Sequence, residues 1–238
     1  AASSDICLNI DDPKKCYEQN IVSTYTLLEG VRRSKVKRLV FASTSAVYGD
    51  ATVIPTPESY APLKPISVYG ATKLACEALV SSYSNSFGIR GVVLRLANVV
   101  GPRCSHGVIH DFVNKLKADP SHLEILGDGT QSKSYLYIDD CVDAIIKVYE
   151  FNGDRVEIFN VGTDDQISVA EIAEITVEEM GLDNVEFRFT GGVDGGRGWI
   201  GDIKNMLLET SRIKRLGWSP KLSSEGAIKL TVKEMIET

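Results

Sequence analysis

Tyr69 and Lys73 stand four residues apart in a segment predicted to be helical, so both side chains face the same side of that helix. A tyrosine with its ordinary pKa of about 10 is a poor base at neutral pH. A lysine one turn away stabilises the phenolate and lowers the pKa of the tyrosine towards neutrality, where proton transfer is most useful. The pair alone is a weak signal, because two common residues at helical spacing usually form a solvated face.

A run of hydroxyl side chains lies upstream of this pair. Residues 41–49 read FASTSAVYG, at the end of an apolar run, Val36–Ala42, that predicts a strand buried on both faces. A second buried strand is predicted at Arg90–Leu96, after a long helix at Ser67–Phe87 that Gly88 ends. Strand, crossover helix and strand predict a parallel sheet, whose carboxyl edge binds ligands. A hydroxyl at that edge, beside a tyrosine and a lysine, favours a proton-transfer site.

The other segments continue the alternation of helices and strands. Asp12 and Pro13 suit the N-cap and first position of a helix over Lys14–Ser34, and Ser168 with Glu171 has the capping-box pattern. Helices are also predicted at Val108–Ala118 and Asp140–Glu150, and strands at Leu123–Leu126, Val156–Val161 and Val185–Thr190. We expect a domain boundary near residue 101, with later segments shared between two lobes.

Composition narrows the class of protein. The chain has 238 residues, 43% of them hydrophobic and 24% charged, which is typical of a globular protein with a proper core. A net charge of −6 argues against a nucleic-acid partner, because phosphate-binding surfaces need a basic excess. The sequence contains no apolar run of about 18 residues and no signal-peptide pattern, so we expect neither a membrane-spanning segment nor secretion.

Cysteine and histidine usage gives two further expectations. The five cysteines are scattered along the chain and include no Cys-x-x-Cys pair, which predicts reduced thiols and a cytoplasmic protein. Cys104, His106 and His110 lie close together, but only the two histidines have helical spacing and no further ligand completes the set. We therefore expect no metal.

Eight segments together resemble a known family: FASTSAVYGD (41–50), PISVYGATK (65–73), LRLANVVGPR (94–103), HGVIHDF (106–112), LGDGTQSKSYLYIDD (126–140), FNVGT (159–163), RGWIGD (197–202) and LGWSP (216–220). The chain resembles the extended short-chain dehydrogenase/reductases, in the NAD-dependent epimerase/dehydratase family, and most of all the archaeal-type UDP-glucose 4-epimerases. The resemblance implies an α/β fold with a Rossmann-like doubly wound parallel sheet and a smaller α/β substrate-binding lobe. It assigns residues 1–101 to the remainder of an NAD-binding domain and 102–238 mainly to the nucleotide-sugar lobe, with some segments returning to the first domain.

The resemblance also implies roles for individual residues. It makes Thr44, Tyr69 and Lys73 catalytic. Cofactor contacts are implied for Asn20, Ala42, Ser43, Tyr69, Lys73 and Leu96, and substrate contacts for Thr44, Asn98, Val108, Ile109, Lys133, Arg197 and Met206. Lys133 stands where many relatives have a phosphate-binding arginine. The lysine keeps the positive charge but loses the bidentate geometry of the guanidinium group. The segment with Arg197 is longer than the family's R-x-G-D, and Met206 falls near the position that limits the C2 substituent of the sugar.

A complete dinucleotide site begins with a strand, a glycine-rich turn and a helix. The chain has a G-x-x-G-x-x-G at Gly192, Gly195 and Gly198, but the residues after it do not predict a helix, so we interpret it as a mobile loop. By the resemblance, Ala1-Ala2 looks like the end of the family's fourth strand. At least two βα units, including the phosphate-binding turn, are then expected upstream of this chain.

The residues after Thr44 discriminate between reactions of this family. A 4,6-dehydratase typically has Asp-Glu there and a decarboxylase Ser-Glu, whereas this chain has Ser45-Ala46. Without a second acid/base pair, a 4-keto sugar can only turn over and take back its hydride, so we expect NAD-dependent 4-epimerisation of UDP-glucose and UDP-galactose. The alternatives are another extended short-chain dehydrogenase activity or a non-catalytic NAD-binding sensor, against which the intact Thr–Tyr–Lys set argues. The resemblance also implies a homodimer through Lys14–Ser34 and Ser67–Phe87; the sugar and the nucleotide stay open.

Overall fold

The structure is a computed structural model that describes residues 2–3 and 12–237. The chain forms two compact units and passes between them several times. Unit 1 comprises Ala1–Leu96, Val142–Val161 and Leu208–Ser219. Unit 2 comprises Ala97–Cys141, Gly162–Leu207 and Pro220–Thr238. Each unit has strands and helices of its own.

Unit 1 is built on a parallel sheet in the order β1-β2-β7, with β1 at Arg38–Thr44, β2 at Arg90–Leu96 and β7 at Val156–Val161. The register pairs Thr44 with Leu96 and Leu96 with Val161, so all three strands end at one edge. The central strand β2 is buried along most of its length, as its apolar run predicts. The predicted strand, crossover helix and parallel strand are confirmed.

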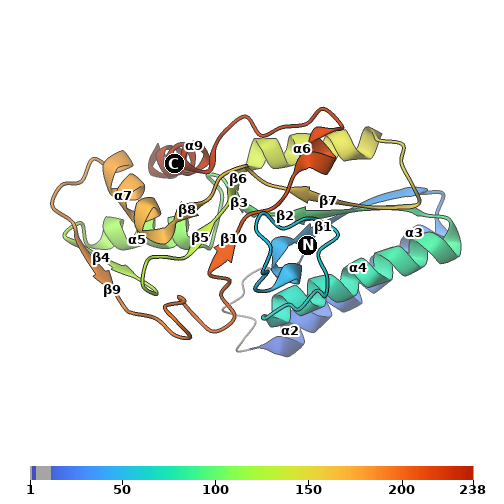
Figure 1. Cartoon of the computed structure of the whole chain (residues 1–238), viewed down its shortest axis with the longest axis horizontal. Coiled ribbons are helices and arrows are strands. Elements are labelled where there is room, and N and C mark those ends of the chain that lie inside the picture. Colours follow the sequence, from blue (N-terminus) through green and yellow to red (C-terminus); the bar gives the residue numbers. More distant parts are fainter. Residues whose placement is uncertain (1, 4–11, 238) are drawn as a thin grey trace. The chain divides into compact units, whose positions relative to one another are not determined.

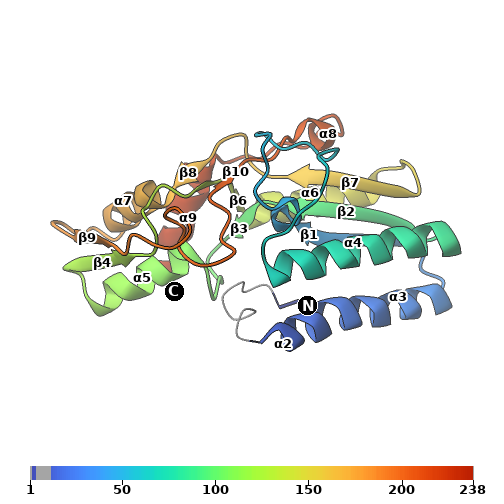
Figure 2. The same ribbon diagram turned by 60° about the horizontal axis from the view of Figure 1, so that its bottom comes forward.

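Helices cover both faces of this sheet. α4 (Val68–Phe87) begins at Ser67, whose hydroxyl accepts a hydrogen bond from the Gly70 N–H (3.1 Å), and ends at Gly88 in the left-handed conformation (φ 66°). α4 packs on β1 and β2 and against α3 (Ser23–Arg33), whereas Figure 1 shows α6 (Ile138–Glu150) on the opposite side of the sheet. Figure 2 shows α2 and α3 following one another in one line that runs beside α4.

The predicted first helix is interrupted. α2 (Pro13–Tyr17) begins as expected, with the Asp12 carboxylate accepting from the Lys15 N–H (3.0 Å), and continues into a π-helical turn, Glu18–Val22, before α3. The wider turn directs Asn20 inward, where the residue is only 2% exposed. The sequence pattern predicts a continuous helix here, and the π turn is a local change that periodicity does not reveal.

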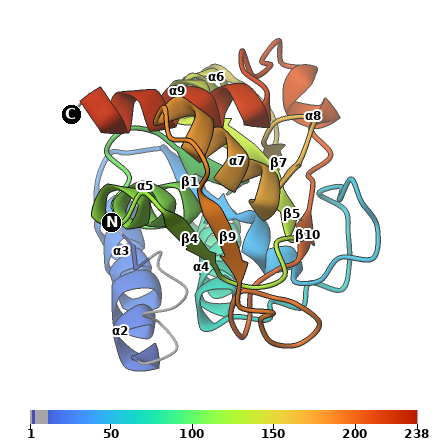
Figure 3. The ribbon, with the colours of Figure 1, turned by 90° about the vertical axis from the view of Figure 1, so that its left-hand side faces the viewer.

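Unit 2 contains three small sheets. β3 (Asn98–Val100) pairs with β6 (Tyr135–Tyr137), β4 (His122–Ile125) pairs with β9 (Glu186–Phe189), and β5 (Ser132–Lys133) lies between β10 (Asn205–Met206) and β8 (Ile167–Ser168). Helices α5 (Val108–Ala118), α7 (Val169–Glu179) and α9 (Ser224–Glu237) share one apolar core with β4. Figure 3 shows how these elements are arranged. The largest buried side chains of this core include Phe112, Leu116, Leu123, Ile172 and Ile228. The short helix α8 (Ser211–Lys214) belongs to unit 1.

Several local expectations can be compared with the structure. The capping box of α7 is present, with Ser168 N–H donating to Glu171 (2.8 Å) and Glu171 N–H to the Ser168 hydroxyl (3.2 Å). α6 begins two residues earlier than predicted, at Ile138, and the Asp140 carboxylate in its first turn accepts from the Lys221 N–H (3.0 Å). Residues 191–203 form turns and a short bridge without a following helix, so the glycine pattern lacks a dinucleotide-site context. Ala1, expected at a strand end, lies outside the described residues.

Over the described part of the chain, no helix has both the length and the apolar character required to cross a membrane.

Candidate active site

The carboxyl end of β1 brings together Thr44 and Tyr69. Thr44 is the last residue of the strand, and its hydroxyl oxygen accepts from the Ala46 N–H (3.2 Å), which begins the short 3-10 helix Ser45–Tyr48. The Thr44 side chain also acts on the phenol of Tyr69, in the first turn of α4. Burial raises the pKa of Tyr69, and the Thr44 side chain opposes this shift. The geometry therefore gives the tyrosine a hydroxyl partner that can relay a proton.

Lys73 lies one helical turn beyond Tyr69 and is 6% exposed. Its ammonium nitrogen is 4.4 Å from the centre of the Phe41 ring, on β1. Burial lowers the pKa of Lys73, and Cys76 and Glu77 oppose that shift. Among the described groups, those that shift the pKa of Tyr69 besides burial are Thr44 and Cys16. The expected lowering of the tyrosine pKa by Lys73 is thus not observed in this arrangement.

Asn20 ties the π turn to α4. Its side-chain nitrogen donates to the Thr72 hydroxyl (2.9 Å), and its side-chain oxygen accepts from the Ser3 N–H (2.9 Å). Thr72 directly precedes Lys73, so Asn20 supports the segment that carries the lysine. π turns inside α-helices occur frequently at functional sites.

The other expected cofactor residues lie at the carboxyl ends of β1 and β2. Ala42 is exposed, Ser43 is buried, and Leu96 is paired with Thr44. Open parallel sheets bind dinucleotides outside this edge. The arrangement, with a buried ammonium close to the edge, fits a dinucleotide cofactor. The Ser43 hydroxyl is engaged within the protein, because it donates to the Glu77 carboxylate (2.5 Å).

Unit 2 brings three of the expected substrate residues together. Lys133, on β5, is directly paired with Met206, on β10. The Lys133 ammonium is 2.5 Å from the Asp202 carboxylate and 5.7 Å from the centre of the Trp199 ring. Arg197 donates to the main-chain oxygen of Asp202. Asp202 therefore joins the two expected cations; sequence reasoning missed it, although it ends the segment RGWIGD (197–202) that carries Arg197.

The remaining expected substrate residues differ in accessibility. Asn98 is half-buried at the start of β3, where its N–H donates to the main-chain oxygen of Ser134 (3.3 Å), next to Lys133. Val108 and Ile109 begin α5. Ile109 is 3% exposed inside the core of unit 2, so its side chain offers little surface to a ligand.

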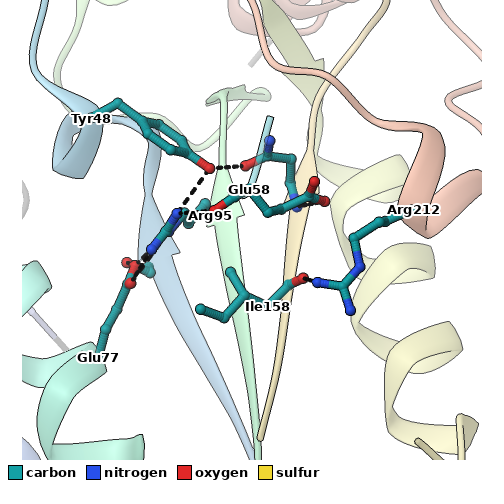
Figure 4. Close-up of polar contacts among 8 residues, drawn as sticks. Tyr48, Glu58, Glu77, Arg95, Ile158 and Arg212 are labelled. Carbon is teal, nitrogen blue, oxygen red and sulfur yellow. Dashed lines mark hydrogen bonds and ion pairs between the residues drawn. The ribbon is translucent and has the colours of Figure 1, made fainter. Parts of the chain in front are cut away.

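A buried polar network that the sequence analysis did not identify lies beside Thr44 and Lys73. Glu77 and Arg95 form an ion pair (2.8 Å) with both residues at most 6% exposed. Arg95 also donates to the Tyr48 phenol (3.0 Å), which in turn donates to Asn160 (2.7 Å). Figure 4 shows this cluster, which connects α4 with β1, β2 and β7. A charged residue in the middle of the apolar run GVVLRL (91–96) was the available signal.

The cysteine–histidine segment gives no metal site in the part of the chain that the structure describes, where no three potential ligands are grouped. Cys104 donates to the main-chain oxygen of His106 (2.9 Å), and His110 is hydrogen-bonded to Asn114.

Known proteins share both sequence and structure with this chain. A crystal structure of a UDP-galactose 4-epimerase is 41% identical, with a TM-score of 0.90, over 100% of this chain and 76% of that protein. The UDP-glucose 4-epimerase of Thermotoga maritima, solved with UDP-glucose, is 32% identical with a TM-score of 0.88 over 100% and 75%. The UDP-glucose 4-epimerase of Corynebacterium glutamicum is 31% identical over 93% of this chain and 70% of its own length. These likenesses confirm the expected Rossmann-like α/β class.

The sequence model of one family, described as the NAD dependent epimerase/dehydratase family, matches residues 1–162. The match spans most of unit 1, including β1, α4 and β2 with the Thr44, Tyr69 and Lys73 side chains. The chain belongs to the NAD dependent epimerase/dehydratase family.

Proposed function

We propose that this protein catalyses the NAD-dependent 4-epimerisation of a nucleotide sugar, interconverting UDP-glucose and UDP-galactose through a transient 4-keto sugar. The observation that carries the proposal is the placement of Thr44, at the carboxyl end of β1, where it acts on the Tyr69 phenol, with Lys73 one turn further along α4. The related UDP-sugar 4-epimerases support the choice of substrate.

In this proposal, Thr44 and Tyr69 remove the proton of the sugar 4-hydroxyl. Lys73 binds the cofactor, together with Asn20 and the strand-end residues Ala42, Ser43 and Leu96. When bound, NAD supplies the acceptor and later the donor of the C4 hydride. The protein's part is to hold the hydroxyl next to a base that gives the proton back on the other face of the sugar.

The substrate diphosphate is assigned to Asn98, Lys133 and Arg197, with the backbone of Val108 and Ile109 along the nucleotide and Met206 near the sugar C2. Both cations contact Asp202, so a diphosphate has to compete with that carboxylate for Lys133. Charge-assisted hydrogen bonds to several phosphate oxygens make this exchange favourable.

Dehydration or decarboxylation is disfavoured by the residues that follow Thr44. Ser45 and Ala46 are buried in the 3-10 helix, and neither offers the carboxylic acid that eliminating water would need. A non-catalytic sensor is disfavoured because it has no need of the Thr44–Tyr69 pair.

The roles of the two units, a homodimer and a cytoplasmic location also belong to this proposal. We assign the nucleotide-binding role to unit 1 and the nucleotide-sugar role mainly to unit 2. A homodimer is supported by the large apolar side chains that α2 and α3 expose, such as Tyr17, Tyr25 and Leu27, each at least 50% exposed. A cytoplasmic location is supported by the free cysteines alone.

The test is turnover of UDP-galactose by the NAD-loaded protein, with Tyr69→Phe and Tyr83→Phe compared. Tyr83 is a matched control, because it also lies on α4 but donates its hydrogen bond to Glu29, away from the site (2.8 Å). We expect UDP-glucose as the product, a loss of at least about 10²-fold in Tyr69→Phe, and near-normal turnover in Tyr83→Phe. Near-normal turnover in Tyr69→Phe would show that Tyr69 is not the catalytic base.

A further inference from the structure

Glu77 stands four residues after Lys73 and eight after Tyr69, so the three residues share one face of α4. Lys73 and Glu77 are each 6% exposed. A carboxylate and an ammonium so deeply buried both need compensation, because removing a charge from water is costly unless it is paired and hydrogen-bonded.

The Glu77 carboxylate is fixed in place by two other elements. Arg95, on β2, donates to it through three hydrogen bonds, from Nε to both oxygens (3.2 and 3.2 Å) and from Nη2 to Oε2 (2.8 Å). Ser43, on β1 next to Thr44, donates to Oε1 (2.5 Å). Arg95 is held in turn by Tyr48 and by the main-chain oxygen of Glu58 (3.2 Å), as Figure 4 shows. The carboxylate thus has a defined position, paired with the Arg95 guanidinium.

The surroundings of Lys73 offer few other compensating groups. From β1 it faces the Phe41 ring at 4.4 Å. On its own helix, Cys76 and Glu77 are the titratable groups that favour its charged form, and burial raises the pKa of the Cys76 thiol, which is therefore neutral at ordinary pH. Cys16, from α2, influences Tyr69 and Cys76. Among the described residues, Glu77 is consequently the fixed negative charge that acts on Lys73.

We propose that Glu77 is a positioning residue for Lys73: its carboxylate, held by Arg95 and Ser43, is the counter-charge that keeps the buried lysine protonated. Because Arg95 shares this carboxylate, it limits how strongly Glu77 attracts Lys73 and leaves the ammonium available to a ligand. Ser43 couples the same carboxylate to the strand end that presents Thr44. The inference rests on the proposed role of Lys73 at the cofactor.

The test combines an NMR titration with pH–activity profiles on the NAD-loaded protein. Lysine side chains are isotope-labelled, and the Lys73 signal is identified by its loss in Lys73→Met. In Glu77→Gln we expect the Lys73 pKa and the alkaline limb of activity to move down by about one unit, because the counter-charge is lost. In Arg95→Gln we expect both to move up, because Glu77 is then free to attract Lys73. Opposite shifts are not expected of a merely structural ion pair.

Two further variants keep the test decisive. Removing one partner of a buried pair is strongly destabilising, whereas replacing both by apolar residues is often neutral. The double variant Glu77→Met/Arg95→Met should therefore fold, and its Lys73 pKa should still lie below that of the unmodified protein. Arg212→Gln is the matched control, because it breaks another ion pair of unit 1, with Glu157 (2.6 Å), and should leave Lys73 unchanged.

An unchanged Lys73 pKa in the folded double variant would overturn the inference. The titration needs no turnover, so its outcome is separate from that of the proposed function. A protein that shows the shifts but converts no UDP-sugar keeps the role of Glu77 and loses the proposed reaction. A protein that epimerises UDP-sugars without these shifts keeps the reaction and loses the role of Glu77.

Discussion

Gly70 lies on α4 between Tyr69 and Lys73, next to the 3-10 helix that follows Thr44. A glycine inside an exposed helix normally costs about 1 kcal/mol relative to alanine, so Gly→Ala is usually stabilising there. At Gly70, however, an added methyl group would lie 2.7 Å from the main-chain oxygen of Ala46 and 3.0 Å from the Pro65 side chain. We therefore expect Gly70→Ala to push α4 away from the 3-10 helix.

The size of this displacement follows from the contact distances. An ordinary van der Waals contact begins at 3.4 Å, so the added methyl and the Ala46 oxygen must separate by about 0.7 Å, the difference between 3.4 and 2.7 Å. Overpacking of this kind typically costs about 1–3 kcal/mol, which cancels or outweighs the gain in helix propensity. A misplacement of about 1 Å in a catalytic arrangement can lower the rate about 10²-fold. We expect a loss of kcat of roughly tenfold to a hundredfold, because Tyr69 moves relative to Thr44.

The measurement is kcat for UDP-galactose together with the Tm of each variant. Gly30→Ala is the matched control, since Gly30 is also helical, in α3, but has no atom within 4 Å of the added methyl. That variant should keep its kcat and gain about 2–4 °C in Tm. The reasoning would be refuted if Gly70→Ala kept normal kcat and gained the same increase in Tm.

Two further predictions concern unit 2. Lys133→Met should raise the KM for a UDP-sugar at least about tenfold, with a smaller change in kcat, because it removes a charge-assisted hydrogen bond to the diphosphate. Lys115→Met, which breaks the surface pair with Asp111 (2.8 Å), is the control. Equal KM values for the two variants would contradict the assignment of Lys133. Ser168→Ala should lower the free energy of unfolding by about 1 kcal/mol through loss of the α7 cap. The Ser168 hydrogen bonds lower the pKa of Glu171 in the folded state. The difference in unfolding free energy should therefore be present above the ordinary Glu pKa of 4.5 and shrink as the pH falls through the lowered pKa of Glu171. Chemical denaturation across pH measures this difference, and a difference that stays constant would contradict the linkage.

Elements with strong local signals were predictable from the sequence. β2, β7 and α5 have the bounds that their apolar patterns predict, and the caps at Asp12 and Ser168 form the expected hydrogen bonds. The strands β3, β5, β6, β8 and β10 have two or three residues each, too few to show a period. In the π turn of the first helix, Asn20 donates to Thr72, 52 residues away, and periodicity does not encode such a contact.

The candidate site was predictable where residue types carry chemistry by themselves. Thr44 and Tyr69 meet as the strand–helix–strand pattern predicts, because the carboxyl ends of parallel strands face the helices that follow them. Glu77 and Arg95 were missed because charged residues on a helix or strand usually face solvent. Their burial follows from packing between α4 and β2, which only the tertiary structure specifies.

The central claim, transient oxidation at the sugar C4 with return of the same hydride, is tested most directly by UDP-galactose carrying deuterium at C4. The NAD-loaded protein should give UDP-glucose with the configuration at C4 inverted and the deuterium still on C4, as NMR of the product would show. Deuterium lost to solvent, inversion at another carbon, or a product lacking the C6 oxygen would contradict the account.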